Sequence, residues 1–204
     1  MKPTAIWLAS KSPRRGELLA QIGVAFEVLR MREAAGRAPD VLEVAHDGEP
    51  PLHYVERIAR TKANAGWQSM LARGLEARPV LGADTEVIVE GEVLGKPADE
   101  RAAKAMLARL AGRTHDVVTA VAIRWQDDTH FALSSTRVTL APLSRAAIAA
   151  YVASGDPFDK AGGYGIQGRA AAFVTRIEGS YSGVMGLPLA ETASLLAKAG
   201  FPVP

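Results

Sequence analysis

Apolar residues recur along this chain at two spacings, and each spacing predicts a different kind of element. Apolar positions three and four residues apart indicate helices that bury one face, whereas short apolar or alternating runs indicate strands. The helical spacing covers the segments 13–22, 52–73, 99–110, 144–153 and 187–199. The strand pattern covers the segments 5–9, 24–31, 79–83, 85–89, 92–94, 114–125, 130–140 and 171–177.

Residues at the ends of these segments support the predicted boundaries. Asp99 and Ser144 are typical N-cap residues, whose side chains accept a hydrogen bond from the first helical turn. Glu90-Gly91 is a two-residue turn typical of a β-hairpin. Because the chain mixes hairpins with longer crossings, we expect an α/β fold with a mixed, partly antiparallel, twisted sheet flanked by helices. We expect it to form a single domain over residues 1–204.

Two loops interrupt the regular pattern. Residues 32–51 have no clear period and contain several glycines and prolines, so we expect a long loop with one short helical turn at 40–45. Residues 154–168 are rich in glycine and predict a second loop, which could close over a ligand. Long loops on a compact domain are often functional, so both are candidates for a binding site.

Composition and charge narrow the possible functions. The chain of 204 residues is 48% hydrophobic and 23% charged, as in an ordinary globular protein. The net charge is only +2, the basic residues are scattered and aromatic residues make up 6%, so binding to nucleic acid is disfavoured. The absence of cysteine excludes disulfides and thiolate chemistry. No apolar run is long enough to cross a membrane, and we expect a soluble intracellular protein.

The stretch from residue 7 to residue 19 is the strongest candidate for binding an anion. Ser12 is placed as an N-cap, and Pro13 is typical of the first helical position. Arg14 and Arg15 follow in the first turn, where the helix dipole disfavours cations. A bound phosphate would reverse that effect, because backbone N–H groups, hydroxyls and guanidiniums would all donate to it. The alternative is an arginine pair on a solvated helix face.

Asp84 is the strongest candidate for catalysis. It directly follows the apolar segment 79–83, and ligands bind at the carboxyl ends of strands in α/β sheets. A carboxylate in that place can bind a metal ion or accept a proton, although a turn aspartate is the alternative. Lys62 and Lys96 are candidate cations for phosphoryl transfer, because fixed positive charge stabilises the transferred group. Both lysines are equally compatible with a solvated surface.

The glycines at 163–168 formally match the dinucleotide-binding fingerprint, but their context does not. The fingerprint requires a strand before the glycines and a helix after them, and here an apolar strand segment follows. In the loop interpretation, the amide of Gln167 can read the edge of a base, because it both donates and accepts hydrogen bonds. The histidines lack metal-ligand spacing and receive no role. A metal site would therefore use Mg²⁺ or Mn²⁺ with carboxylates and phosphate oxygens.

Motifs in a fixed order along most of the chain resemble the Maf family of nucleoside triphosphate pyrophosphatases. The motifs are Ser10-Lys11-Ser12-Pro13-Arg14-Arg15, Gly82-Ala83-Asp84-Thr85, Gly95-Lys96-Pro97, Asp159-Lys160-Ala161-Gly162 with Tyr164-Gly165-Ile166-Gln167-Gly168, and Gly179-Ser180-Tyr181 with Gly186-Leu187-Pro188. The resemblance implies an elongated architecture related to the inosine triphosphatase-like fold, with two lobes and a cleft between them. It also implies a cytoplasmic enzyme, commonly a homodimer.

The same resemblance implies a reaction and a set of site residues. The family hydrolyses a nucleoside triphosphate to the monophosphate and pyrophosphate with a divalent cation, and Asp84 is then the proton acceptor and a metal ligand. The implied triphosphate site consists of Ser10, Arg15, Lys62 and Lys96. The residues that match the branch acting on dTTP and UTP are Arg14, Thr85 and Gln167. The family is also linked with arrest of septum formation and with removal of modified nucleotides.

One departure from the family pattern lies after the second predicted strand. The family usually has adjacent acidic residues there, whereas this chain has Arg32-Glu33-Ala34 and an enlarged loop. Glu33 is the only carboxylate near that place, so the resemblance implies it as the second metal residue beside Asp84. An alternative function is a nucleotide-binding regulator of cell division with little catalysis, which would release no pyrophosphate from any nucleotide.

Overall fold

The computed structural model describes residues 4–32, 40–201 and 203 of the chain. These residues form an α/β fold with a mixed sheet of seven strands, in the order β2-β1-β3-β5-β6-β7, with β4 paired to β3. The strands are β1 (Ile6–Leu8), β2 (Phe26–Val28), β3 (Val80–Val89), β4 (Glu92–Leu94), β5 (Thr114–Trp125), β6 (Asp128–Leu140) and β7 (Val174–Glu178). The α-helices are α1 (Pro13–Gln21), α2 (Pro51–Ala72), α3 (Glu100–Leu110), α4 (Arg145–Val152), α5 (Tyr181–Met185) and α6 (Leu189–Lys198). The expected fold class is confirmed.

The chain divides into two compact units, which are described separately. Unit 1 consists of Met1–Asp84, Thr119–Ser134 and Gly186–Pro204, and unit 2 consists of Thr85–Val118 and Ser135–Met185. Strands β3, β5 and β6 contribute residues to both units. The expectation of one domain with two lobes and a cleft stays a prediction.

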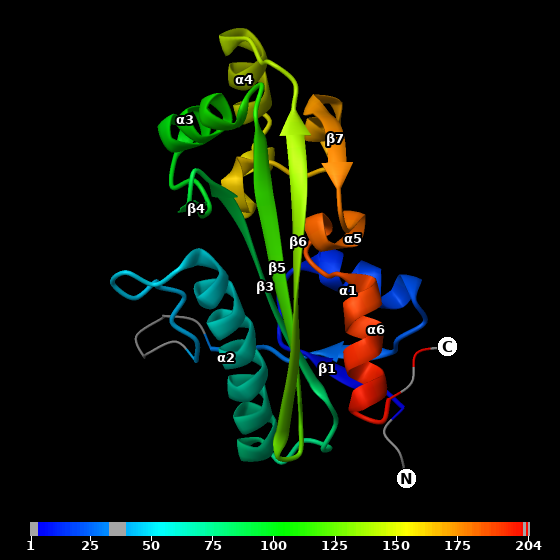
Figure 1. Ribbon diagram of the computed structural model, residues 1–204. Helices are drawn as coiled ribbons and strands as arrows, with labels where there is room; N and C mark the ends of the chain where they lie inside the picture. The colour runs from blue at the N-terminus through cyan, green and yellow to red at the C-terminus, as the bar shows by residue number, and fades with distance from the viewer. Residues whose placement is uncertain (1–3, 33–39, 202, 204) are drawn as a thin grey trace. The chain divides into compact units, whose positions relative to one another are not determined.

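Unit 1 is built on parallel strands. β1 pairs in parallel with β2 and with β3, and helix α2 lies on one side of the unit's strands while α1 and α6 lie on the other (Figure 1). The apolar spacing predicted that α2 buries one face, and this is confirmed. The buried residues of that face include Val55, Ile58, Ala59, Ala63, Trp67 and Met70. Trp67 also meets Trp125 of β5 edge to face, with 5.9 Å between ring centroids.

Gly82 allows α2 to lie unusually close to β3. A Cβ atom at this position would stand 2.5 Å from the backbone nitrogen of Ala63 and 2.7 Å from the carbonyl oxygen of Ala59. Both atoms belong to helix backbone and cannot move aside, so any larger residue would push the helix away. The close approach determines how far a side chain from this part of α2 must reach to meet β3.

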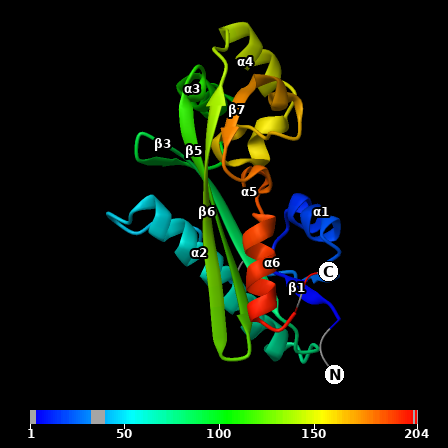
Figure 2. The ribbon, with the colours of Figure 1, turned by 45° about the vertical axis from the view of Figure 1, so that its right-hand side comes forward.

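Unit 2 is built on antiparallel pairs. β3 turns into β4 through Glu90 and Gly91, which both have positive φ, as expected for the predicted hairpin. β6 pairs in the antiparallel direction with β7, and Figure 2 shows the two strands side by side. The predicted N-caps are confirmed: Asp99 Oδ1 accepts from the Ala102 N–H at 2.7 Å, and Ser144 Oγ accepts from the Ala147 N–H at 3.1 Å.

Several predicted boundaries are wrong. The helical turn expected at 40–45 does not form; instead, the carboxylate of Asp40 accepts from the backbone N–H and Nε of Arg32, both at 2.7 Å. The strand expected at 171–177 starts only at Val174, because a 3₁₀ helix occupies Arg169–Phe173. Helix α5 was not predicted, since five residues are too few to show a helical period.

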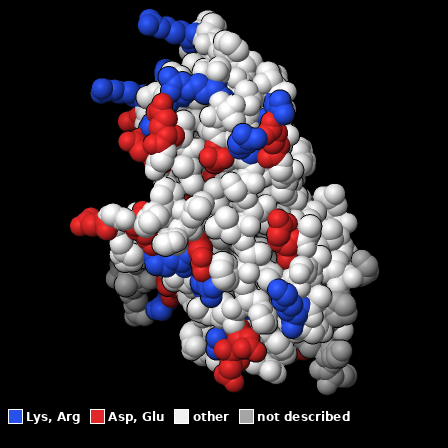
Figure 3. Space-filling view, in the orientation of Figure 1, with Lys and Arg blue, Asp and Glu red and all other residues white. Residues whose placement is uncertain are grey.

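The described surface mixes both signs of charge. On the face shown in Figure 3, lysine and arginine side chains alternate with aspartate and glutamate side chains over the described residues. Among those residues, no helix is long and apolar enough to cross a membrane.

Candidate active site

Arg15 is fixed by its own hydrogen bonds rather than extended into solvent. Its side chain is buried at the start of α1; Nε donates to the carbonyl oxygen of Gly186 at 2.8 Å, and Nη1 donates to Ser10 Oγ at 2.9 Å. Gly186 lies far along the chain, in the Gly-Leu-Pro segment before α6. The N-terminal and C-terminal motifs therefore meet in unit 1, and the guanidinium is held in one orientation.

Ser10, not Ser12, provides the hydroxyl contact at the start of α1. Ser12 occupies the N-cap position with Pro13 as the first helical residue, as expected, but its side chain makes no capping hydrogen bond. Instead, Ser10 Oγ accepts from the Ser12 N–H at 3.2 Å as well as from Arg15. Ser10 and Arg15, both implied for the triphosphate site, are therefore in direct contact. Arg14, the neighbouring arginine, is half-buried.

Asp84 lies within a strand, and the prediction that a strand ends at this residue is wrong. β3 runs without interruption from Val80 to Val89, and the Asp84 side chain is buried. A carboxylate is rare inside a strand, and here it is accommodated because Lys62 Nζ donates to Asp84 Oδ1 at 2.8 Å. The approach of α2 over Gly82, two residues earlier on the same face of β3, brings Lys62 within reach.

Among the described residues, no group donates a hydrogen bond to the second carboxylate oxygen of Asp84. Oδ2 is buried and has no hydrogen-bond partner within residues 4–32, 40–201 and 203. A buried carboxylate oxygen without a donor costs free energy, so such atoms in native proteins usually serve a ligand, a water or an ion. This is the feature of the site that most directly suggests chemistry.

Strand register places the Ser10–Arg15 pair near the Asp84–Lys62 pair. The Ala9 N–H donates to the carbonyl of Leu81, so β1 leaves its ladder with β3 at that point. Asp84 is three residues further along β3, which at about 3.3 Å per residue is about 10 Å. Both pairs therefore lie beyond the point where the pairing of β1 with β3 ends, and both belong to unit 1.

Three further candidate residues belong to unit 2. Thr85 follows Asp84 directly on β3, Lys96 is exposed after β4, and Gln167 is exposed in the glycine-rich segment. The backbone beside Lys96 is anchored, because the carbonyl of Gly95 accepts from the Gly162 N–H at 3.0 Å. Lys96 thus starts from a fixed backbone position close to the segment that leads to Gln167.

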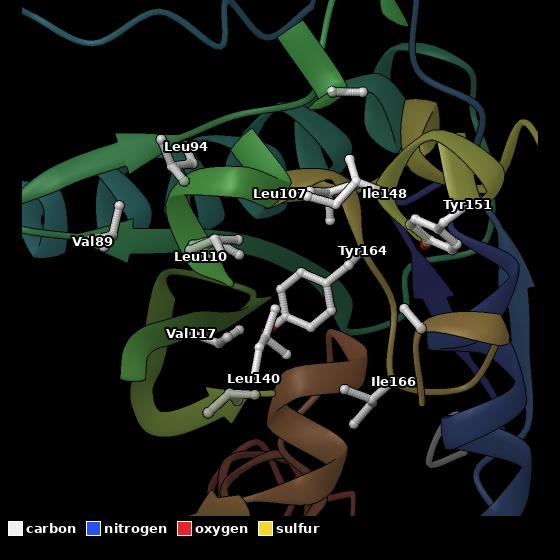
Figure 4. Close-up of a cluster of buried hydrophobic side chains, with 14 of the residues drawn as sticks. Val89, Leu94, Leu107, Leu110, Val117, Leu140, Ile148, Tyr151, Tyr164 and Ile166 are labelled. Carbon is white, nitrogen blue, oxygen red and sulfur yellow. The ribbon is translucent and has the colours of Figure 1, made fainter. Parts of the chain in front are cut away.

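The base of that glycine-rich segment is anchored by a buried polar pair that the sequence did not indicate. His115 Nε2 and the Tyr164 hydroxyl are 2.6 Å apart, and the tyrosine ring points among Leu110, Val117 and Leu140 (Figure 4). Burial lowers the pKa of His115 to about 4 and raises the pKa of Tyr164. Both groups are therefore neutral at physiological pH. The sequence signal that could have indicated burial of His115 is the alternation of side chains along a strand. His115 lies two residues before the buried Val117 and therefore on the same face of β5.

The expected acidic residue beside Asp84 is not tested, and a second acidic residue contacts Lys62. Glu33 lies outside the described residues, so its implied role as a metal ligand has no structural test. Glu43, which the sequence did not single out, contacts Lys62: its Oε1 lies 3.0 Å from Lys62 Nζ. No short-range pattern could have indicated this contact, because the two residues come from a loop and a helix that only the fold brings together.

Comparison with known proteins places the chain in a family. The sequence model of the Maf family, described as Maf-like protein, matches residues 5–199. The chain belongs to the Maf family. A Maf-family relative from Aromatoleum aromaticum, named dTTP/UTP pyrophosphatase, is 52% identical over 206 residues, covering 100% of both chains. A protein of the same name from Burkholderia pseudomallei is 55% identical over 196 residues, covering 95% of this chain and 93% of its own.

A solved structure of the Staphylococcus aureus Ham1 protein is also similar to this Maf-family chain, at 14% identity. The match covers 67% of this chain and 72% of that one with a TM-score of 0.40, too low to carry an argument. The expected relation to the inosine triphosphatase-like architecture stays a prediction.

Proposed function

We propose that this protein hydrolyses dTTP and UTP to the nucleoside monophosphate and pyrophosphate, with modified pyrimidine nucleotides as further candidate substrates. The observation that carries the proposal is the buried Asp84, held by Lys62 and retaining one unused oxygen. It occurs in a chain that matches proteins named dTTP/UTP pyrophosphatase over nearly its full length.

In this proposal the triphosphate is held by fixed cations. Arg15 is already oriented by Ser10 and Gly186, so little side-chain entropy is lost when its guanidinium binds a phosphate. Lys62 and Lys96 add two ammonium groups, and Ser10 adds a hydroxyl. Positive charge held in place stabilises the negative charge that develops on the leaving pyrophosphate.

Asp84 is the proposed proton acceptor. Lys62 fixes Oδ1, which leaves Oδ2 to accept a proton from an attacking water. The water oxygen bonds to the α-phosphorus, the bond from that phosphorus to the bridging oxygen breaks, and pyrophosphate leaves with that oxygen. The proton passes to Asp84. Because the displacement needs no covalent bond to the protein, positioning and charge account for most of the catalysis.

The residues present fit a divalent cation that is shared with the substrate. Asp84 Oδ2 is a buried oxygen without a donor, and carboxylate oxygens are the ligands that Mg²⁺ and Mn²⁺ prefer. Among the described residues, no group of three or more histidine, aspartate or glutamate side chains could hold a metal. A bound cation would neutralise charge on the phosphate oxygens. As the alternative use of this same oxygen atom, we propose Asp84 as a ligand, with Glu33 as the second one implied by the family.

Base selection is proposed for the three residues that match the dTTP/UTP branch: Arg14, Thr85 and Gln167. Uracil and thymine share an edge with one acceptor at O4 and one donor at N3. The amide of Gln167 can satisfy both, because it carries a donor and an acceptor. A homodimer and a cytoplasmic location stay predictions from the family.

Pyrophosphate release tests the proposed function. The purified protein is given dTTP, UTP, dCTP, GTP and ATP with Mg²⁺, and pyrophosphate is measured. We expect dTTP and UTP to react fastest, with one monophosphate formed for each pyrophosphate. Release of single phosphates, or a purine preference, would contradict the proposal. Binding of nucleotide without any release would instead favour the alternative, a nucleotide-binding regulator of cell division.

A further inference from the structure

Gln167 lies on a short turn at the end of the glycine-rich segment in unit 2. The N–H of Gly168 donates to the carbonyl of Gly165 at 3.3 Å, so Ile166 and Gln167 are the two central residues of this turn. Ile166 is buried in the apolar cluster of unit 2, whereas Gln167 is exposed (Figure 4). The turn therefore has one side chain in the core and presents the next one to solvent.

The backbone before the turn is packed directly on the β3–β4 hairpin. The Gly162 N–H donates to the carbonyl of Gly95 at 3.0 Å. A Cβ atom at Gly162 would stand 2.8 Å from the Val87 side chain, and the φ of this glycine is positive, at 67°. The start of the segment is thus held close to β3 by its backbone, five residues before Gln167.

The hydrogen bond between His115 and Tyr164 is the second anchor, three residues before Gln167. His115 Nε2 and the Tyr164 hydroxyl are 2.6 Å apart, and both side chains are buried. Among the described residues, His115 Nδ1 has no hydrogen-bond partner, so this bond is the polar contact that orients the imidazole. Apolar packing alone is not directional, whereas a hydrogen bond fixes both distance and angle. The bond therefore sets where the segment lies on β5.

We infer that His115 and Tyr164 are positioning residues for base selection, because their hydrogen bond holds the turn that presents Gln167. This inference rests on the proposed function, in which the amide of Gln167 reads the base. Hydrogen bonds weaken steeply when their geometry is distorted, so an amide on a loosely held turn discriminates less between bases. The pair itself touches no substrate in this proposal.

Tyr164→Phe tests the inference, with Ile148→Val as the matched control. The phenylalanine keeps the ring in the apolar cluster and removes only the hydroxyl. We expect the preference for UTP over GTP, measured as the ratio of kcat/KM values, to fall about two- to fivefold, less than one full hydrogen bond. Ile148→Val removes a buried methyl group from the same cluster and should lower Tm without changing the preference.

A double variant separates positioning from stability. Replacing both partners of a buried hydrogen bond by apolar groups can be nearly neutral for stability, whereas removing one partner is not. His115→Leu combined with Tyr164→Phe should therefore have a Tm at least as high as Tyr164→Phe alone, but its preference should stay low. Recovery of the preference in the double variant, or an equal loss of preference in Ile148→Val, would show that the pair acts only through stability and would overturn the inference.

Hydrogen exchange gives a readout that needs no catalysis. Backbone amides of residues 160–168 should exchange faster in Tyr164→Phe, while those of α2 in unit 1 should keep their rates. Unchanged exchange in the segment, or an unchanged preference, would overturn the inference. If the unaltered protein released no pyrophosphate, the proposed function would fail. The preference would then be measured as the binding of UTP relative to GTP by calorimetry, so the two failures are distinguishable.

Discussion

The two compact units bury their polar side chains in different ways. In unit 1 the buried polar residues include two ionic side chains beside neutral serine and threonine: Asp84 bonded to Lys62, and Arg15 bonded to Ser10 and a backbone carbonyl. In unit 2 the buried pair of His115 and Tyr164 is neutral and surrounded by apolar side chains. Buried charge is costly and is retained mainly where it serves a ligand, whereas a neutral hydrogen-bonded pair can serve structure alone. We therefore expect losses of chemistry from variants of Asp84, and losses of stability or selectivity from variants of His115 and Gln167.

The largest expected effect is the loss of turnover in Asp84→Asn. The amide cannot accept the proton, so kcat should fall at least ~100-fold, the low end of general-base contributions. Nucleotide binding should be retained, because the amide oxygen still accepts from Lys62. Turnover is measured by pyrophosphate release, and binding by calorimetry. A kcat near that of the unaltered protein would remove Asp84 from the mechanism and with it the assignment of chemistry to unit 1.

Acid should destabilise the fold through His115 in unit 2. Its pKa is about 4 in the folded protein and near 6.5 when exposed, so between these values the unfolded chain binds the additional proton. The stability contribution is thus complete above about pH 6.5 and is lost as the pH falls toward 4, by about 3 kcal/mol at most.

Denaturant unfolding at several pH values measures this loss. The variant His115→Gln keeps a partner for Tyr164 and has no titrating group, so its free energy of unfolding should fall less between pH 6.5 and 4. Equal slopes for the two proteins would show that the carboxylates alone cause the acid dependence, and that the buried pair in unit 2 contributes nothing to it.

The smallest expected effect is a change of base preference in Gln167→Glu. A carboxylate cannot donate to O4, so the preference for UTP over GTP should fall roughly five- to tenfold, the equivalent of one hydrogen bond. Arg15→Ala in unit 1 provides the contrast, because it should lower kcat/KM for both nucleotides by a similar factor. If Arg15→Ala changed the preference and Gln167→Glu did not, the roles proposed for these two residues would be reversed.

Much of the local structure could be predicted from the sequence. Helix α2 followed from its apolar period, and the starts of α3 and α4 followed from Asp99 and Ser144, because these signals act over a few residues. The wrong prediction of a strand end at Asp84 also arises because sequence signals act over only a few residues. An aspartate in a strand pattern indicates a break, and only a lysine from a distant helix makes its burial acceptable.

The residue types of the candidate site could be predicted, but the hydrogen bonds and ion pairs between them could not. Motif resemblance implied Ser10, Arg15, Lys62 and Asp84, yet neither the carbonyl of Gly186 behind Arg15 nor the carboxylate of Glu43 beside Lys62 could be foreseen. Both contacts join residues that are far apart in sequence or separated by a loop of irregular structure. These contacts form only when distant segments pack together in the fold, so no local sequence pattern can predict them.

The sequence by itself determined the family, the elements and the chemical groups available to the site. The tertiary structure alone decided the state of those groups. It decided that Asp84 lies inside β3, with one oxygen bonded and one that has no donor among the described residues, and that Lys62 is shared between two carboxylates. The physical reason is that residue identity fixes which charges exist, whereas burial and distance fix how strongly they act, and both arise only when distant segments pack together.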